Sequence, residues 1–307
     1  GWVDCGTPLV AFRRTVNQHY SGIAEFAVVK KPFDKLRQGI AQRYYVPREG
    51  ASVTTRGSKR QPHVADWQSA KLFFRSPQSV NIRIAISDGQ PYMCRTRASD
   101  EVQMIETKGN MNAVSYRFTR VTPRTTLFGM ALESDNGVIL DNFSMRGSSG
   151  AQLGRIPSST LSDFARLRPY DLIVVHYGLN DAVKGNTLPL LKVYIKRMKR
   201  SIENLRAAYP SAGILVVSVP DRDQRSAEGI TTLKEVKELV ALQAQLAADC
   251  GVGFFNLYQA MGGESSMKRL VDSHRANKDY THLSFGGGKV VAGKVFPSFI
   301  AGLENYK

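Results

Sequence analysis

Residues 171–181 read Asp-Leu-Ile-Val-Val-His-Tyr-Gly-Leu-Asn-Asp. Their central run, Leu172-Ile173-Val174-Val175, is continuously apolar, which is typical of a strand buried on both faces of a parallel sheet. Gly178 then opens a turn, and Asn180 follows within it. Function in open parallel sheets gathers in the loops beyond the carboxyl ends of the strands. Asn180 therefore lies in such a loop, although a lone Asn there is more often a cap of the turn or of the next helix.

The rest of the second half alternates between strand and helix patterns. Residues 187–207 carry one apolar stripe, which indicates an amphipathic helix. A strand is predicted over residues 214–219, a helix over 233–247, a third strand over 253–257 and a terminal helix over 284–302. Strands that alternate with helices in this way predict a parallel sheet with helices on both faces.

The chain before residue 140 has a different texture. Its apolar residues alternate with polar ones in short runs between turn formers, at residues 70–74, 80–86, 113–118 and 126–132. A period of two at this spacing predicts an antiparallel β-sandwich, which we place at residues 25–140. Residues 47–62 are rich in Arg, Gly, Ser and Thr, and we expect them to form a surface loop.

Composition excludes several classes of protein. A chain of 307 residues is long enough for two modest domains, or for one domain with a large insertion. It contains no apolar stretch near the ~20 residues that a membrane span needs. Cys5, Cys94 and Cys250 are too scattered to indicate a zinc site or a disulfide framework. We expect neither a metal nor an organic cofactor.

The net charge of +16 favours anionic partners. The excess of Lys and Arg is spread over both halves of the chain, whereas a nucleic-acid footprint is usually a patch or a stripe. No zinc-finger spacing, aromatic RNA-binding motif or basic heptad accompanies it. Nucleic-acid binding therefore rests on charge alone, and we do not expect it.

A second signature, Asp279-Tyr280-Thr281-His282, precedes the predicted terminal helix. Side chains three apart at the start of a helix share a face, so the Asp279 carboxylate can accept from one nitrogen of His282 and leave the other as a general base. The Asn180 amide can donate to an oxygen that becomes negative in a tetrahedral intermediate. The alternative is structural, with Asp279 and Asn180 as caps and His282 on the surface. The conjunction of the two signatures favours an acyl-transfer site.

These motifs resemble those of the SGNH, or GDSL-type, hydrolases. Gly178-Leu179-Asn180-Asp181 is similar to the third sequence block of that family, residues 279–282 to the fifth, and residues 142–150 to the second. The resemblance implies an α/β fold with a flavodoxin-like parallel sheet, helices on both faces and an inserted antiparallel β-sandwich. It implies that residues 1–24 begin the hydrolase-like domain, that 25–140 form a carbohydrate-binding-like module, and that 141–307 complete the hydrolase.

The resemblance also implies a function and a site. The catalytic residues would be His282, Asp279, Asn180 and Gly147, with Gly147 offering its backbone N–H to the oxyanion. The β-rich module, together with Met261-Gly262-Gly263 before the last block, resembles peptidoglycan O-acetylesterase-like members. The implied reaction removes an acyl group, expected to be acetyl, from a cell-wall or other glycan, with peptidoglycan as one candidate. The implied location is periplasmic or secreted.

The nucleophile of that family lies in a Gly-Asp-Ser block, and no Gly-Asp-Ser occurs in this sequence. Asp4-Cys5 is one alternative, a degenerate block with a thiol nucleophile. We expect instead that the serine, with the strand that positions it, lies upstream of residue 1. The competing hypothesis is a non-catalytic glycan-binding protein on a hydrolase-like scaffold. The sequence leaves the oligomeric state open.

Overall fold

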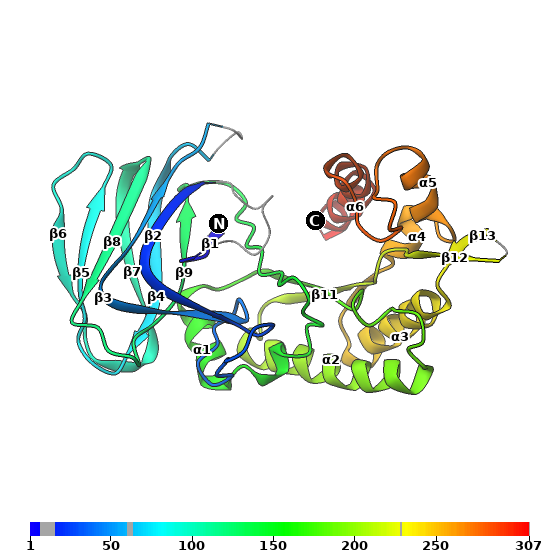
Figure 1. The fold of residues 1–307 in the computed structure, drawn as a ribbon, viewed down its shortest axis with the longest axis horizontal. Helices are drawn as coiled ribbons and strands as arrows, with labels where there is room; N and C mark the ends of the chain where they lie inside the picture. The colour runs from blue at the N-terminus through cyan, green and yellow to red at the C-terminus, as the bar shows by residue number, and fades with distance from the viewer. Residues whose placement is uncertain (7–15, 60–63, 228, 307) are drawn as a thin grey trace. The chain divides into compact units, whose positions relative to one another are not determined.

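A computed structural model describes residues 1–6, 16–59, 64–227 and 229–306. The chain divides into two compact units (Figure 1). The first unit contains Gly1–Ser148 and Arg155–Pro169, and the second contains Ser149–Gly154 and Tyr170–Lys307. Residues 141–148 and 155–169, which the sequence pattern placed with the α/β part, thus have their contacts in the first unit.

The first unit is built on an antiparallel sheet, as the period-two pattern predicts. Its described strands follow the order β6-β5-β8-β3-β9-β4-β7, with β1 on β9 and β2 on β3. The strands are β1 Trp2–Val3, β2 Asn17–Ala27, β3 Arg43–Arg56, β4 Trp67–Ser76, β5 Asn81–Ile86, β6 Tyr92–Arg95, β7 Ser99–Met111, β8 Ala113–Thr119 and β9 Thr126–Glu133.

All of these strands are linked into one sheet, so the predicted sandwich of two sheets is not established. The link is β3, which pairs with β8 over Ser52–Arg56 and with β9 at Tyr45. Much of the loop expected at residues 47–62 is therefore strand, while residues 60–62 lie outside the described part of the chain. Strands β1 and β2, from the stretch assigned to the start of the hydrolase, also belong to this sheet.

Apolar side chains on one face of the curled sheet form the core of the first unit. In β5, Ile82 and Ile84 are fully buried while Arg83 between them is exposed, which is the alternation a half-buried strand requires. The same cluster includes Cys5, Tyr45, Val53, Leu72, Phe74, Tyr116, Phe118, Leu127 and Met130. The strand periodicity thus translates directly into a hydrophobic core.

Helix α1 (Ser158–Leu167), which follows the 3-10 helix η2 (Leu153–Arg155), packs on this unit through Phe164. The Phe164 ring lies 5.8 Å from that of Phe73 and 5.3 Å from that of Phe128. Arg168 follows the helix and is only 5% exposed.

The Arg168 guanidinium lies within a network of buried charges. It is 2.6 Å from a carboxylate oxygen of Glu133 and is hydrogen-bonded to both carboxylate oxygens of Asp141. Lys71 reaches the other oxygen of Glu133 at 2.8 Å. Burial alone would raise the pKa of Glu133, but hydrogen bonds and charge from Lys71 and Arg168 outweigh it and lower that pKa.

The second unit contains a parallel sheet of order β10-β11-β14, with strands β10 Leu172–His176, β11 Gly213–Val217 and β14 Gly253–Phe255. The predicted strands and helices are confirmed to within a few residues. Three parallel strands in the described residues do not establish a flavodoxin-like core. The unit also has helices α2 Leu188–Ala208, α3 Lys234–Cys250, α4 Leu257–Met261, α5 Ser266–Asp272 and α6 Phe285–Tyr306, and a hairpin of β12 Asp223–Ser226 and β13 Gly229–Thr232. Among the helices within the described ranges, none has the length and apolar character that a bilayer crossing demands.

The buried charges predict a sharp contrast between two neighbouring arginines. Arg168→Ala leaves Glu133 and Asp141 without their buried partner, and we expect it to lower the free energy of unfolding by about 3 kcal/mol or more. Arg166→Ala removes a guanidinium that is 54% exposed and forms surface pairs with Glu101 and Asp163. Its expected cost is below about 1 kcal/mol. Urea unfolding followed by circular dichroism measures both, and equal losses would contradict the role assigned to Arg168.

Candidate active site

Asp279 and His282 are brought together in one turn of the second unit. The Asp279 Oδ2 atom lies 2.8 Å from Nδ1 of His282. The other carboxylate oxygen, Oδ1, accepts from the backbone N–H groups of Thr281 at 2.9 Å and His282 at 3.0 Å. The side chain of His282 is 70% exposed and that of Asp279 is 49% exposed. One carboxylate therefore fixes both the backbone of the turn and the orientation of the imidazole.

The sequence pattern suggested that these residues start a helix, but the structure places them in a turn. Helix α6 begins only at Phe285, and the preceding segment is closed by the Ser284 N–H donating to the Arg275 carbonyl at 2.9 Å. Asn277 N–H likewise donates to the carbonyl of His282 at 2.8 Å. Asp279 and His282, three residues apart, are brought together by a hydrogen-bonded turn, which places residues i and i+3 close to each other as a helix would.

Tyr280 anchors the turn. Its side chain is buried with Val217, Leu257, Met261 and Met267. Its φ of +54° is a left-handed conformation that costs a non-glycine residue about 1 kcal/mol. Burial of the ring offsets this cost, because a fully buried aromatic side chain contributes on the order of 2 kcal/mol.

The backbone of Tyr280 is also fixed at both polar groups. Its N–H donates to the Asn277 carbonyl at 3.0 Å, and its carbonyl accepts from the Asp223 N–H at 3.1 Å. With Tyr280 held in the core, its neighbours Asp279 and His282 remain at the surface. The Asp279–His282 pair is therefore exposed to solvent on a turn whose backbone is held in place by Tyr280.

The hydrogen bonds also set the ionisation of Asp279. Partial burial alone would raise the pKa of its carboxyl, but the backbone N–H and ring of His282, together with the Thr281 N–H, outweigh it and lower that pKa. Asp279 is therefore a carboxylate at neutral pH. An ionised partner at Nδ1 favours the tautomer in which Nε2 carries the lone pair that a general base requires.

Asn180 lies in the loop after β10, as predicted, and is exposed. Gly178 makes the turn possible: its φ is +114°, and a Cβ there would lie 3.0 Å from Val219 and 3.1 Å from Gln243. The Gly178 carbonyl accepts from the N–H groups of Asp181 at 2.8 Å and Ala182 at 2.9 Å. This glycine therefore places Asn180 just beyond the strand end, in the same unit as the Asp279–His282 turn.

Gly147 and Cys5 belong to the first unit. Gly147 lies in an exposed turn with φ +78°, beside the Ser148 N–H that donates to the Met145 carbonyl at 3.1 Å. Cys5 is fully buried in the core of the sheet, where burial and then the charge of Asp4 raise the pKa of its thiol. A buried neutral thiol is not a nucleophile, so the Asp4-Cys5 alternative is wrong.

Gln243 is a supporting residue that motif reasoning missed. It is buried on α3, its Nε2 donates to the Tyr177 carbonyl at 2.8 Å, and its Oε1 accepts from the Val219 N–H at 2.9 Å. It thereby ties the chain after β10 to the chain after β11. The sequence signal was a single amide within the apolar stripe of residues 233–247. Over the part of the chain that the structure describes, no group of three His, Cys, Asp or Glu side chains is arranged to hold a metal ion.

Comparison with known proteins agrees with the motifs. A profile described as the GDSL-like Lipase/Acylhydrolase family matches residues 115–287. The match covers more than half of the chain, and the chain belongs to this family. Among curated protein sequences, none matches it.

One solved structure shares the fold over the whole chain. The structure described as "Peptidoglycan O-acetylesterase in action, 5 min" has a TM-score of 0.79 at 18% identity, covering 100% of this chain and 83% of that one. At this identity the likeness establishes the SGNH hydrolase-like fold. A carbohydrate acetylesterase from Sinorhizobium meliloti matches at 21% identity with a TM-score of 0.35, covering 48% of this chain and 67% of that one, which is too distant to bear on the fold.

Two adjacent glycines at the start of α6 should respond oppositely to alanine. A Cβ on Gly287 would lie 1.9 Å from the carbonyl oxygen of Arg275, whereas one on Gly288 meets nothing within 4 Å. Gly287→Ala must push apart the backbone that closes the site turn, and we expect a loss of about 1–3 kcal/mol in unfolding free energy. Gly288→Ala should gain up to about 1 kcal/mol in helix propensity. Thermal and urea unfolding test this, and similar effects at both positions would contradict the close approach.

Asp181 should make the stability depend on pH. Burial raises the pKa of its carboxyl to about 6, against the opposing charge of Arg197. Between about pH 4 and pH 6 the unfolded chain has lost this proton while the folded chain keeps it, so stability falls as pH rises. Asp181→Asn should therefore stabilise the protein by about 1–3 kcal/mol at pH 8 and leave it unchanged near pH 3.5.

Urea unfolding at the two pH values measures this difference. Asp171→Asn is the matched control, because it removes an exposed carboxylate just before the same strand. Its expected effect is below about 0.5 kcal/mol at either pH. A pH-independent effect of Asp181→Asn would show that its carboxyl does not retain the proton in the folded state.

Proposed function

We propose that this protein is an ester hydrolase that removes acyl groups, with acetyl as the expected group, from a cell-wall or other glycan. The observation that carries the proposal is the 2.8 Å contact between Asp279 Oδ2 and His282 Nδ1, on a turn whose backbone the same carboxylate holds. Within the described residues, Nε2 of His282 makes no hydrogen bond, and the ring is largely exposed. An oriented imidazole with an accessible Nε2 is the general base that acyl transfer needs.

The proposed reaction proceeds through an acyl-enzyme. A serine Oγ attacks the ester carbonyl carbon while Nε2 of His282 takes its proton, and the carbonyl oxygen becomes negative. The Asn180 side-chain amide and the Gly147 backbone N–H are the proposed donors to that oxygen. When the C–O bond breaks, His282 returns the proton to the departing sugar hydroxyl. Water then repeats the sequence and releases the acid.

We propose that the attacking serine lies upstream of residue 1. Support comes from β10, which pairs only with β11 among the described strands. Its side chains Leu172 and Val174, two residues apart on one face, are each 45% exposed. Exposed apolar side chains on a parallel strand favour a further element packed against it, because parallel sheets are covered on both faces.

The substrate class rests on weaker support and is part of the same proposal. A solved structure that shares the fold is described as a peptidoglycan O-acetylesterase, so an acetylated glycan such as peptidoglycan is the candidate substrate. The net charge of +16 suits approach to anionic polymer. A periplasmic or secreted location would follow from such a substrate, and residues 25–140 would then serve as a glycan-binding module beside the hydrolase part.

Variants of the natural full-length protein test the assignment through acetate release from an O-acetylated glycan and hydrolysis of p-nitrophenyl acetate. His282→Ala should lower kcat by about 10²–10⁴-fold, because it removes the general base. Asp279→Asn should also lower kcat, since it favours the wrong tautomer, and Asn180→Ala should cost about 10²–10³-fold in kcat. His19→Ala replaces an exposed histidine of the other unit and should have no effect.

Full activity of His282→Ala would refute the proposed site. Absence of hydrolysis by the unmodified full-length protein, with retained binding of the glycan, would favour the alternative of a non-catalytic glycan-binding protein. The two results are distinguishable because binding is measured independently of acetate release.

A further inference from the structure

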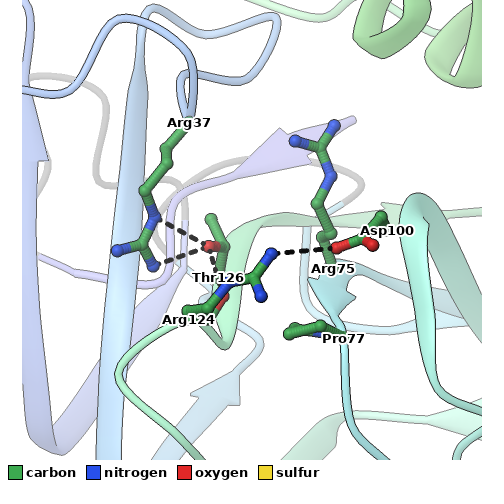
Figure 2. Close-up of a pocket in the computed structure, with 6 residues that line it drawn as sticks. All are labelled: Arg37, Arg75, Pro77, Asp100, Arg124 and Thr126. Carbon is green, nitrogen blue, oxygen red and sulfur yellow. Dashed lines mark hydrogen bonds and ion pairs between the residues drawn. The ribbon is translucent and has the colours of Figure 1, made fainter.

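The first unit contains a pocket lined by three arginines. Its lining residues are Arg37, Arg75, Pro77, Asp100, Arg124 and Thr126. In Figure 2 the Arg37 side chain reaches Thr126 and the Arg124 side chain reaches Asp100, while the Arg75 side chain extends in a different direction. The lining residues include three arginines and one carboxylate, which gives the lining a formal excess of two positive charges. Such a set attracts an anion.

Arg75 is the residue that most requires a partner. It makes no ion pair with any residue in the described ranges, and its Nε is buried without a hydrogen-bond acceptor. One Nη2 contact, to Thr160 Oγ1 at 2.6 Å, and the Phe128 ring, 5.6 Å away, hold the guanidinium in place. Partial burial lowers the pKa of Arg75, against the opposing charges of Asp163 and Asp100. A half-buried guanidinium that forms no ion pair loses part of its hydration, and an anionic ligand would offset that loss.

The other two arginines complete the pocket in different ways. Arg37 is fixed, because its Nε and Nη2 donate to Thr126 Oγ1 at 3.2 and 2.8 Å. Arg124 is exposed by comparison: it lies 3.3 Å from Asp100, and both side chains are more than 70% exposed. An exposed pair of this kind exchanges partners at little cost.

A second acidic group near Arg75, Asp163, is already engaged. Its Oδ2 accepts from the Val102 N–H at 2.8 Å, and its Oδ1 lies 3.3 Å from Arg166. Its charge acts on Arg75 from nearby, but its two oxygens are held by other partners, and it forms no ion pair with Arg75. Two half-buried arginines held by hydrogen bonds, beside one exposed arginine, are features that favour a small oxyanion.

We propose that this pocket binds a carboxylate or phosphate group of an acidic glycan, as a recognition subsite separate from the Asp279–His282 turn. The oxyanion class follows from the three arginines. The glycan as its carrier rests on the proposed function. Both carboxylate and phosphate offer oxygens that a guanidinium can contact in pairs, so the experiment separates the two sources.

Isothermal titration at constant ionic strength tests the proposal with D-glucuronate, inorganic phosphate and neutral D-glucose as probes. We expect saturable binding of glucuronate or phosphate and none of glucose. Arg75→Gln should weaken binding about ten-fold or more, since it removes a charge-assisted contact. Arg124→Gln, on the exposed rim, should weaken it about three-fold without affecting the fold. Arg83→Gln, an exposed arginine on β5, makes the same charge change outside the pocket and should change affinity less than about two-fold.

The outcomes are distinct. Binding of glucuronate identifies the ligand group as a carboxylate, and binding of inorganic phosphate identifies it as a phosphate. Either result supports the proposal when Arg75→Gln or Arg124→Gln weakens binding and Arg83→Gln does not. No saturable binding, equal losses in all three variants, or equal binding of glucose would overturn it. Tighter, Arg75-dependent binding of a single-stranded oligonucleotide than of an acidic oligosaccharide would overturn the glycan assignment. Binding retained in His282→Ala keeps this result independent of hydrolysis.

Discussion

The proposed site depends on one carboxylate. Asp279 accepts from two backbone N–H groups of its own turn and contacts the ring of His282, so the same group shapes the loop and orients the base. A side chain that is half exposed can hold this geometry only because Tyr280, beside it, is anchored in the core. Tyr280 thus carries a left-handed backbone conformation beside the acid–base pair, and burial of its ring offsets the strain.

Features encoded by neighbouring residues could be predicted from the sequence. The β10 strand, the Gly178 turn with Asn180 after it, and the Asp279–His282 contact all arise from short segments with their own pattern. A helix start was expected around Asp279, and the structure has a turn there. Spacing alone does not distinguish a helix from a turn, because residues i and i+3 come together in both. The nucleophile could not be assigned, since no Gly-Asp-Ser is present to mark it.

Features that need distant segments could not be predicted. Helix α1 packs on the β-sheet through Phe164, and nothing in residues 155–169 alone indicates this partner. Arg37, Arg75 and Arg124 meet at one pocket although each lies in a different segment. The net charge of +16 does not distinguish these arginines: Arg168 is ion-paired in a buried network, whereas Arg75 forms no ion pair within the described part of the chain. A charge count therefore predicts an anionic partner in general and misses the place that would bind it.

The most direct test of the central claim is labelling of the natural full-length protein with a fluorophosphonate probe, followed by peptide mass spectrometry. The probe reacts with a serine that a neighbouring base activates. The account predicts one labelled serine, located before residue 1, and loss of the label in His282→Ala and in Asp279→Asn. A label on a serine within residues 1–307 that persists in His282→Ala would contradict it, because the nucleophile would then be activated by a different base.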